Sequence, residues 1–274
     1  MRAVWLVALT GVGCGGAAER VAPPAIAPEP GAVDEQAPAL GLHAGETMQF
    51  EVRLGGILAG EAALAVGEPE DRGRTSTIAV RSRLATVGAA AMIKTVVDDA
   101  TTVIDVETGR PLEMTTEVEY GSTQYSATAT WTAAGRVVDI LWSRKDTSGG
   151  GKVHFDFKGQ IAHDAHSAMA EIREWRAPEG ARRTVWVVGG RRLWRADLVV
   201  GPTETLGTAM GNRPTIRLEG TAYRARGNLA LDTGKKPRKF TVWVSDDADR
   251  VPLRVRAGTE LGDVTIDLVD YHRP

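Results

Sequence analysis

The sequence predicts a mainly β protein in which one antiparallel sheet packs against a single amphipathic helix. Two observations predict this fold class. Apolar and polar residues alternate through most of the chain after residue 46, which is typical of strands that bury one face. Helical spacing of apolar residues is convincing in only one segment, near residue 170. Parallel strands would need helices between them, so we expect an antiparallel sheet.

Composition places the chain among ordinary globular proteins. It has 274 residues, of which 43% are hydrophobic and 25% are charged, so it can build a core that needs no disulfide or metal. The formal net charge is −2, which gives no electrostatic reason to expect a nucleic-acid partner.

The chain begins with the features of a bacterial lipoprotein signal peptide. Arg2 supplies a positive charge, residues 3–9 form a short apolar run, and small residues precede Cys14, the sole cysteine. The run is too short to span a membrane as a mature helix. We therefore predict a signal peptide over residues 1–13 and a lipid on Cys14 that anchors the protein to a membrane of the cell envelope.

Two residues near Cys14 refine this prediction. A lipobox usually has leucine at the position of Gly11, so a plain secretory signal with an incidental cysteine is the alternative. Gly15 stands where many lipoproteins retained at the inner membrane have aspartate. We therefore expect the outer membrane, with the domain facing the periplasm.

The chain after the signal divides into a tether and one domain. Residues 14–42 are rich in Pro, Ala and Glu and show no apolar period, so we predict a disordered, semi-extended tether. Residues 43–274 show no internal repeat and no second linker, so we predict a single antiparallel β domain.

Strand patterns follow one another through this domain. The first is ETMQFEVRL at residues 46–54, where Met48, Phe50 and Val52 share one face. Alternation recurs over 78–84, 125–131, 153–159, 215–223, 239–245, 252–257 and 263–269. The segment VGAAAMIKTVV at 87–97 fits either a helical turn or the start of a strand.

The predicted helix occupies residues 164–177. Asp164 is suited to the N-cap, and Pro178 with Gly180 would end the helix. Its apolar stripe includes Met169, Ile172 and Trp175, which we expect to face the sheet.

An acidic turn between two strands is the most polar cluster near a strand end. It contains Asp246, Asp247, Asp249 and Arg250. Clustered carboxylates could hold a hard cation, but an EF-hand loop would need a glycine and a terminal glutamate that are missing. A tight turn, with the Asp side chains bonded to local backbone N–H groups and Arg250 tethering it, is the favoured interpretation.

Other candidate sites are weaker. His163 and His166 could share a metal, but no further ligand completes a zinc site, and His166 is expected on a polar side of the helix. The segment SGGGK at 148–152 lacks the full phosphate-loop pattern and is expected to be a hairpin loop. The basic segment 235–239 is expected at a hairpin tip. No nucleophile motif is present, so we predict no catalytic residue, cofactor or metal.

Several segments together resemble the domain-of-unknown-function 3108 family. GETMQFEVRLGGILAGEAALAV at 45–66 is similar to the family's opening strands, and residues 240–271 are similar to its ending. VIDVETGRPLEM at 103–114 and HDAHSAMAEIRE at 163–174 are similar to motifs between them. The resemblance implies an envelope protein with a curved antiparallel sheet or incomplete barrel, and it implies no activity.

Two non-enzymatic functions fit these expectations. In the first, an apolar ligand, such as a lipid or a lipidated partner, binds in the cup of the sheet against Met169, Ile172 and Trp175. In the second, the chain is an assembly module that holds another envelope protein by an exposed strand edge or an aromatic face, such as that of Trp243. A deep apolar pocket between helix and sheet would favour the carrier, whereas a filled cup would favour the module.

Overall fold

The computed structural model describes residues 40–274 except 74, 146–148 and 260–261. The predicted signal peptide, Cys14 and nearly all of the predicted tether therefore lie outside the described residues. The predicted boundary at residue 43 is slightly late, because Leu42 is buried in the main core and Leu40 packs against it.

The described chain alternates strands with short connections, as the sequence predicts. The N-terminal half contains β1 (Thr47–Leu54), β2 (Ile57–Val66), β3 (Glu70–Arg72), β4 (Thr75–Thr86), α1 (Gly88–Ile93), β5 (Val96–Asp105), β6 (Pro111–Tyr120), β7 (Thr123–Thr132), the 3₁₀ turn η1 (Ala133–Gly135), β8 (Val137–Arg144) and β9 (Gly150–Asp156). The C-terminal half contains β10 (Ala162–His163), α2 (Ala165–Glu174), β11 (Arg182–Gly189), β12 (Arg192–Thr208), β13 (Gly211–Ala225), β14 (Arg238–Ser245), β15 (Pro252–Thr259) and β16 (Gly262–His272).

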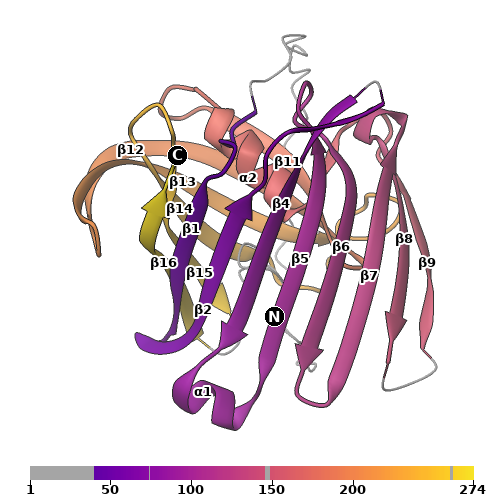
Figure 1. The fold of residues 1–274 in the computed structure, drawn as a ribbon, viewed down its shortest axis with the longest axis horizontal. Helices are drawn as coiled ribbons and strands as arrows, with labels where there is room; N and C mark the ends of the chain where they lie inside the picture. Colours follow the sequence, from indigo (N-terminus) through magenta and orange to yellow (C-terminus); the bar gives the residue numbers. More distant parts are fainter. Residues whose placement is uncertain (1–39, 74, 146–148, 260–261) are drawn as a thin grey trace.

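All these strands belong to one continuous sheet. Strands β1 to β9 form an N-terminal arm and β10 to β16 form a C-terminal arm, and the arms join where β16 pairs with β1. Every pairing is antiparallel except the two-residue pairing of β10 with β11. The two helices lie toward opposite ends of the N-terminal arm's strands, α2 near one end and α1 at the other (Figure 1).

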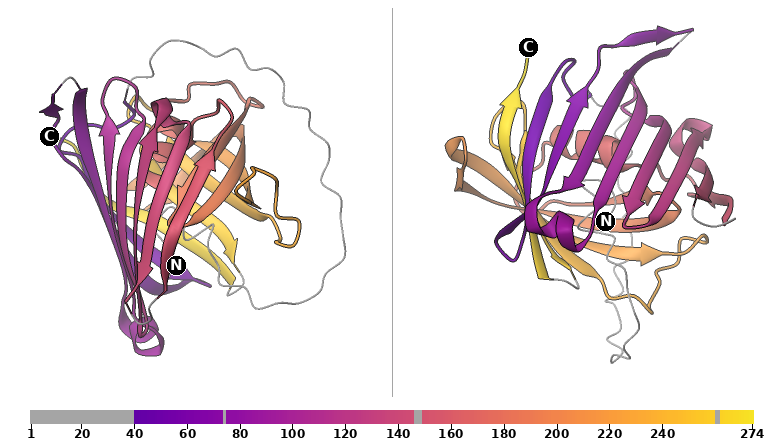
Figure 2. Two further views of the ribbon diagram at one scale, coloured as in Figure 1. Left: turned by 90° about the vertical axis from the view of Figure 1, so that its right-hand side faces the viewer. Right: turned by 60° about the horizontal axis from the view of Figure 1, so that its bottom comes forward.

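The sheet curves so that its two arms face each other without closing (Figure 2). The ends of the strand order, β9 and β10, are not hydrogen-bonded to each other. A buried cluster bridges them instead, in which Phe157 contacts Trp186 edge-on with ring centroids 6.0 Å apart. This architecture confirms the expected curved sheet or incomplete barrel.

A second, larger core fills the space between the arms at their junction. It combines the inner residues of β1, β2 and β4 with those of β12 to β16 and with α2. Buried and more exposed residues alternate along β1, β2 and β5. The alternation in the sequence therefore predicts correctly which residues face the core. The expected apolar helix on the concave side is confirmed, although it ends at Glu174, earlier than residue 177, because Trp175 already has extended backbone angles.

Candidate functional site

The cup of the sheet is filled by α2 rather than left open. Met169 is 3% exposed and Trp175 is 7% exposed, and both belong to the main buried cluster. Ile172 is half-buried and packs against the same cluster. The three candidate cup residues therefore contact the protein's own core.

Polar contacts fix the first turn of α2. Asp164 is the N-cap, as the sequence predicts, and its side chain accepts hydrogen bonds from the backbone N–H and the hydroxyl of Ser167. Ser167 in turn accepts from the backbone N–H of Asp164, which completes a capping box. These reciprocal bonds satisfy two of the N–H groups that a helix start leaves unpaired.

Beneath this turn, His166 joins the helix to two strands of the N-terminal arm. Its Nε2 atom lies 2.9 Å from the Ser82 hydroxyl on β4, and its Nδ1 atom lies 2.8 Å from the Thr102 hydroxyl on β5. Thr102 donates its proton to Asp164. One consistent assignment has Nδ1–H donating to Thr102 and Nε2 accepting from Ser82, which makes the imidazole neutral.

Burial explains this protonation state. His166 is 1% exposed, so the polar side of the helix on which the sequence places it faces buried hydroxyl groups. Its hydrogen-bonding neighbours are Ser82 and Thr102 of the sheet, because α2 lies between the arms. Burial lowers the pKa of His166, and the nearby Asp164 carboxylate opposes that shift. The pKa of His163 is also lowered by burial.

The order Ser82, His166, Asp164 invites comparison with a catalytic triad. Ser82 is only 6% exposed and its hydroxyl is on the inner face of β4. A nucleophile must reach its substrate, and this hydroxyl is covered by α2. We therefore assign the hydrogen-bonded chain a structural role, which is to hold α2 on β4 and β5.

The other end of α2 is held by a buried ion pair. Arg173 and Glu46 are 1% and 0% exposed, and two bonds of 2.6 and 3.1 Å join the guanidinium to the carboxylate. Tyr271 donates to the same carboxylate, and burial together with Glu46 raises the pKa of Tyr271 to about 12. Removing one partner would leave the other charged and unpaired in the core, which is costly.

The predicted polar turn lies against this same end of α2. Asp247 accepts from the backbone N–H groups of Asp249 and Arg250, each at 3.0 Å, as expected for a tight turn. Arg250 donates to the backbone oxygen of Trp175. The backbone N–H of Asp246 donates to the carbonyl oxygen of Pro214. In the part of the chain that the structure describes, no group of three or more His, Cys, Asp or Glu side chains could hold a metal ion.

The remaining sequence candidates are dispersed. Trp243 lies on the outer face of β14, half-buried, and its indole N–H donates to Glu204. The basic segment 235–239 falls in the β13–β14 connection and the start of β14, and its lysines are exposed. Of the segment 148–152, residues 150–152 begin β9, and Ser148 lies outside the described residues.

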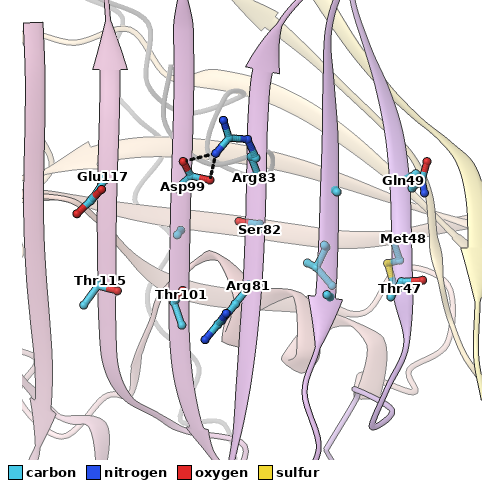
Figure 3. A pocket seen from close by; sticks show the side chains of 14 residues that line it. Thr47, Met48, Gln49, Arg81, Ser82, Arg83, Asp99, Thr101, Thr115 and Glu117 are labelled. Atoms are coloured by element: carbon cyan, nitrogen blue, oxygen red, sulfur yellow. Dashed lines mark hydrogen bonds and ion pairs between the residues drawn. The ribbon is translucent and has the colours of Figure 1, made fainter.

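A hollow lies on the outer face of the N-terminal arm (Figure 3). This outer groove has a volume of about 630 Å³ and runs across β1, β2, β4, β5 and β6. Cross-strand pairing arranges its outward side chains in two parallel rows. One row is Thr47, Ala65, Arg81, Thr101 and Thr115, and the other is Gln49, Ala63, Arg83, Asp99 and Glu117.

The two rows differ in charge. In the second row, Arg83 makes two bonds of 2.8 and 2.9 Å to Asp99, so these charges neutralise each other. In the first row, Arg81 lies between Ala65 and Thr101 and has no acidic partner among the described residues. Ala63 and Ala65 are exposed and have small side chains, so a bound chain could approach the sheet closely there.

Sequence reasoning missed the groove and both buried polar contacts of α2. The outward residues of each strand were readable from the alternation, but the neighbours of Arg81 depend on pairing between separate strands. Glu46 and Arg173 are 127 residues apart in the chain. Arg173 is one of several polar residues in the helix that was expected to pack on the sheet, so nothing in the sequence indicated its buried partner.

These features define a class of open, curved antiparallel sheet proteins with a packed helix between the arms. The chain belongs to the family described as Protein of unknown function (DUF3108), whose model matches residues 49–269. A comparison with curated proteins finds no match to this sequence.

Two solved structures illustrate what the chain is similar to. A beta-barrel-like protein of domain of unknown function DUF1849 from Brucella abortus is 10% identical, with a TM-score of 0.49, covering 84% of this chain and 98% of that one. The hypothetical lipoprotein YmcC from Escherichia coli is 13% identical, with a TM-score of 0.32, covering 84% and 85%. Within residues 40–274, leaving out the undescribed positions, no helix is long and apolar enough to cross a membrane.

Proposed function

We propose that this chain is a non-catalytic cell-envelope protein that docks a segment of another envelope protein in its outer groove. The observation that carries the proposal is the contrast between the two faces of the N-terminal arm. The inner face is occupied by α2 and its core, whereas the outer face has an open groove of about 630 Å³. A filled cup favours an assembly module over a carrier of apolar ligands.

The charges of the groove indicate the chemistry of its partner. The groove contains two arginines and two acidic residues, so it has no net charge. Anionic lipid surfaces and nucleic acids are bound by surfaces of one, positive sign. A groove with charges of both signs and several hydroxyl groups is instead suited to a polypeptide, because protein interfaces place opposite charges against each other.

Within that groove, Arg81 is the residue that we expect to select the partner. Its guanidinium lacks an acidic neighbour in the described part of the chain, and the hydroxyl of Thr101 beside it can donate to the same ligand. A carboxylate presents two oxygens to a guanidinium in a fixed geometry. The partner segment should therefore place an Asp or Glu side chain over Arg81.

Localisation to the envelope is part of the proposal and is supported by the signal sequence with Cys14. We expect Cys14→Ala to release the protein from the membrane fraction. Persistence of the variant in membranes would contradict the lipid anchor, and it would leave the groove proposal to its own test.

That test is photo-crosslinking in cells from a crosslinking amino acid placed at Thr115, at one end of the groove. We expect a protein adduct that Arg81→Glu abolishes and that Arg213→Glu, the same charge change on exposed β13, leaves intact. Mass spectrometry of the adduct should identify a segment with an acidic residue. Changing that acid to arginine should restore crosslinking to the Arg81→Glu variant.

Absence of an adduct, an adduct that Arg81→Glu does not change, or adducts to lipid alone would overturn the proposal. Far-ultraviolet circular dichroism of each variant distinguishes a lost contact from misfolding. We expect an unchanged spectrum for Arg81→Glu, because Arg81 is exposed.

A further inference from the structure

One end of the sheet exposes an unusual group of large apolar side chains. Ile57, Met92 and Ile93 are 72%, 89% and 86% exposed. The last two belong to α1, a helix with no buried residue. Ile57 begins β2, against which α1 lies, and a hydrogen bond of 3.1 Å from the N–H of Val87 to Ala59 ties the two segments together.

We propose that this end is a membrane-contact tip that inserts Ile57, Met92 and Ile93 into the surface of a lipid bilayer. The tip comprises residues 54–59, 87–95 and 120–123. These three segments meet because the N–H of Gly121 bonds to Thr95 at 2.8 Å and the Lys94 ammonium lies 3.7 Å above the Tyr120 ring. This end of the strands is opposite the end near α2 (Figure 1).

The composition of the tip favours a bilayer over a protein partner. The three segments contain no acidic residue, and Lys94 is their sole charged side chain. Apolar side chains at the apex, with a lysine and a tyrosine behind them, are the arrangement found at membrane interfaces. A protein-docking patch usually has a polar rim that defines its partner. The polar side chains of these segments are Lys94, Tyr120 and the hydroxyls of Thr95, Ser122 and Thr123, with no carboxylate to select a partner.

The chain outside the structure is long enough for this contact. The described residues begin beside α2, where Gly41 lies against Ala170, and β4 spans 12 residues, or about 40 Å, from there toward the tip. An extended tether over residues 15–39 would reach about 75 Å at ~3.1 Å per residue. A lipid on Cys14 and the tip could therefore contact the same membrane, and two contacts are what stable anchoring requires.

The experiment measures sedimentation with large unilamellar vesicles of phosphatidylethanolamine and phosphatidylglycerol. The protein is the chain from residue 14 with Cys14→Ala, so that no acyl group contributes. We expect binding that the triple variant Ile57→Ser, Met92→Ser, Ile93→Ser weakens at least tenfold, which is about 1.4 kcal/mol. Leu141→Ser is the matched control, because Leu141 is 55% exposed but lies on β8, outside the tip, and it should bind normally.

Lys94→Glu should weaken binding to these anionic vesicles more than binding to neutral phosphatidylcholine vesicles. The proposal fails if the parent protein does not sediment, if the triple variant sediments equally, or if Leu141→Ser has the same effect as the triple variant. It also fails if size-exclusion chromatography shows a dimer that the triple variant dissociates and vesicle binding is absent, since the tip would then contact a second copy.

Discussion

The two helices of this protein differ in almost every respect that burial can measure. α2 is enclosed between the arms, and even its Arg173 is 1% exposed. α1 buries none of its residues, and two large apolar side chains at its end face solvent. The helix with charged groups is inside and the helix without them is outside, which is the reverse of what polarity alone predicts.

The difference shows where stability and function are separated in this chain. Each polar group of α2 that we describe has a specific partner, such as Glu46 for Arg173 or Ser82 for His166, so α2 positions the arms. Nothing in the described residues covers α1, so its apolar side chains add nothing to the core. Variants of the two helices should therefore affect different measurements.

The largest expected effect on stability comes from removing the Trp175 side chain. Trp175→Ala should lower the free energy of unfolding by about 3–5 kcal/mol, because its indole fills a packed core at the end of α2. Ile93→Ala, the matched change on α1, should alter it by no more than about 0.5 kcal/mol. Urea denaturation of both variants measures the contrast; a mild Trp175→Ala would show that the cup contains space.

Breaking the ion pair should have a comparable effect. Arg173→Met should destabilise the fold by about 3–5 kcal/mol, because Glu46 would remain charged in the core without its partner. The double variant Arg173→Met, Glu46→Leu should be more stable than Arg173→Met alone, since it buries no charge. If the double variant is instead the least stable in denaturation, the pair is a net source of stability.

A smaller effect is expected from pH. Burial lowers the pKa of His163 and His166 below the usual 6.5, so the unfolded chain binds protons more readily than the folded one. Their contribution to stability is therefore intact above pH 6.5 and is lost as pH falls from 6.5 toward the folded-state pKa. The loss is at most about 1.4 kcal/mol per pH unit for each histidine.

His166→Gln should make this loss shallower, because one of the two buried imidazoles is removed. The measurement is the free energy of unfolding at several pH values between 7 and 5. His154→Gln is the control, since His154 is exposed on β9 and pairs with Asp139 at the surface. Equal pH dependence in wild type and His166→Gln would mean that folding does not change the pKa of His166.

The structural features that the sequence predicts depend on residues close together in the chain. The apolar stripe of α2 and its Asp164 cap follow from residues three and four positions apart, and each strand's faces follow from alternation. The bond from His166 to Ser82 joins residues 84 positions apart, and the groove around Arg81 depends on which strands become neighbours. Such contacts arise from the closing of the arms, which no local pattern encodes.

The segment containing α1 shows the limit of pattern reading most clearly. Its sequence, Gly-Ala-Ala-Ala-Met-Ile, permitted a helical turn or a strand, and the structure forms a short helix. Its exposure could not be read from the letters, because an apolar hexapeptide is usually a core segment. Only the position of α1 at the end of the sheet reveals it as surface.

Native mass spectrometry of the chain purified from the cell envelope tests the central claim, that α2 fills the cup and leaves no room for cargo. Two variants are compared, Cys14→Ala alone and Cys14→Ala combined with the triple serine change at Ile57, Met92 and Ile93, so that neither acylation nor the tip retains lipid. The account predicts that the second protein has the mass of the polypeptide alone. A lipid bound to it in a one-to-one ratio, and lost on Trp175→Ala, would contradict the account and establish the cup as a carrier site.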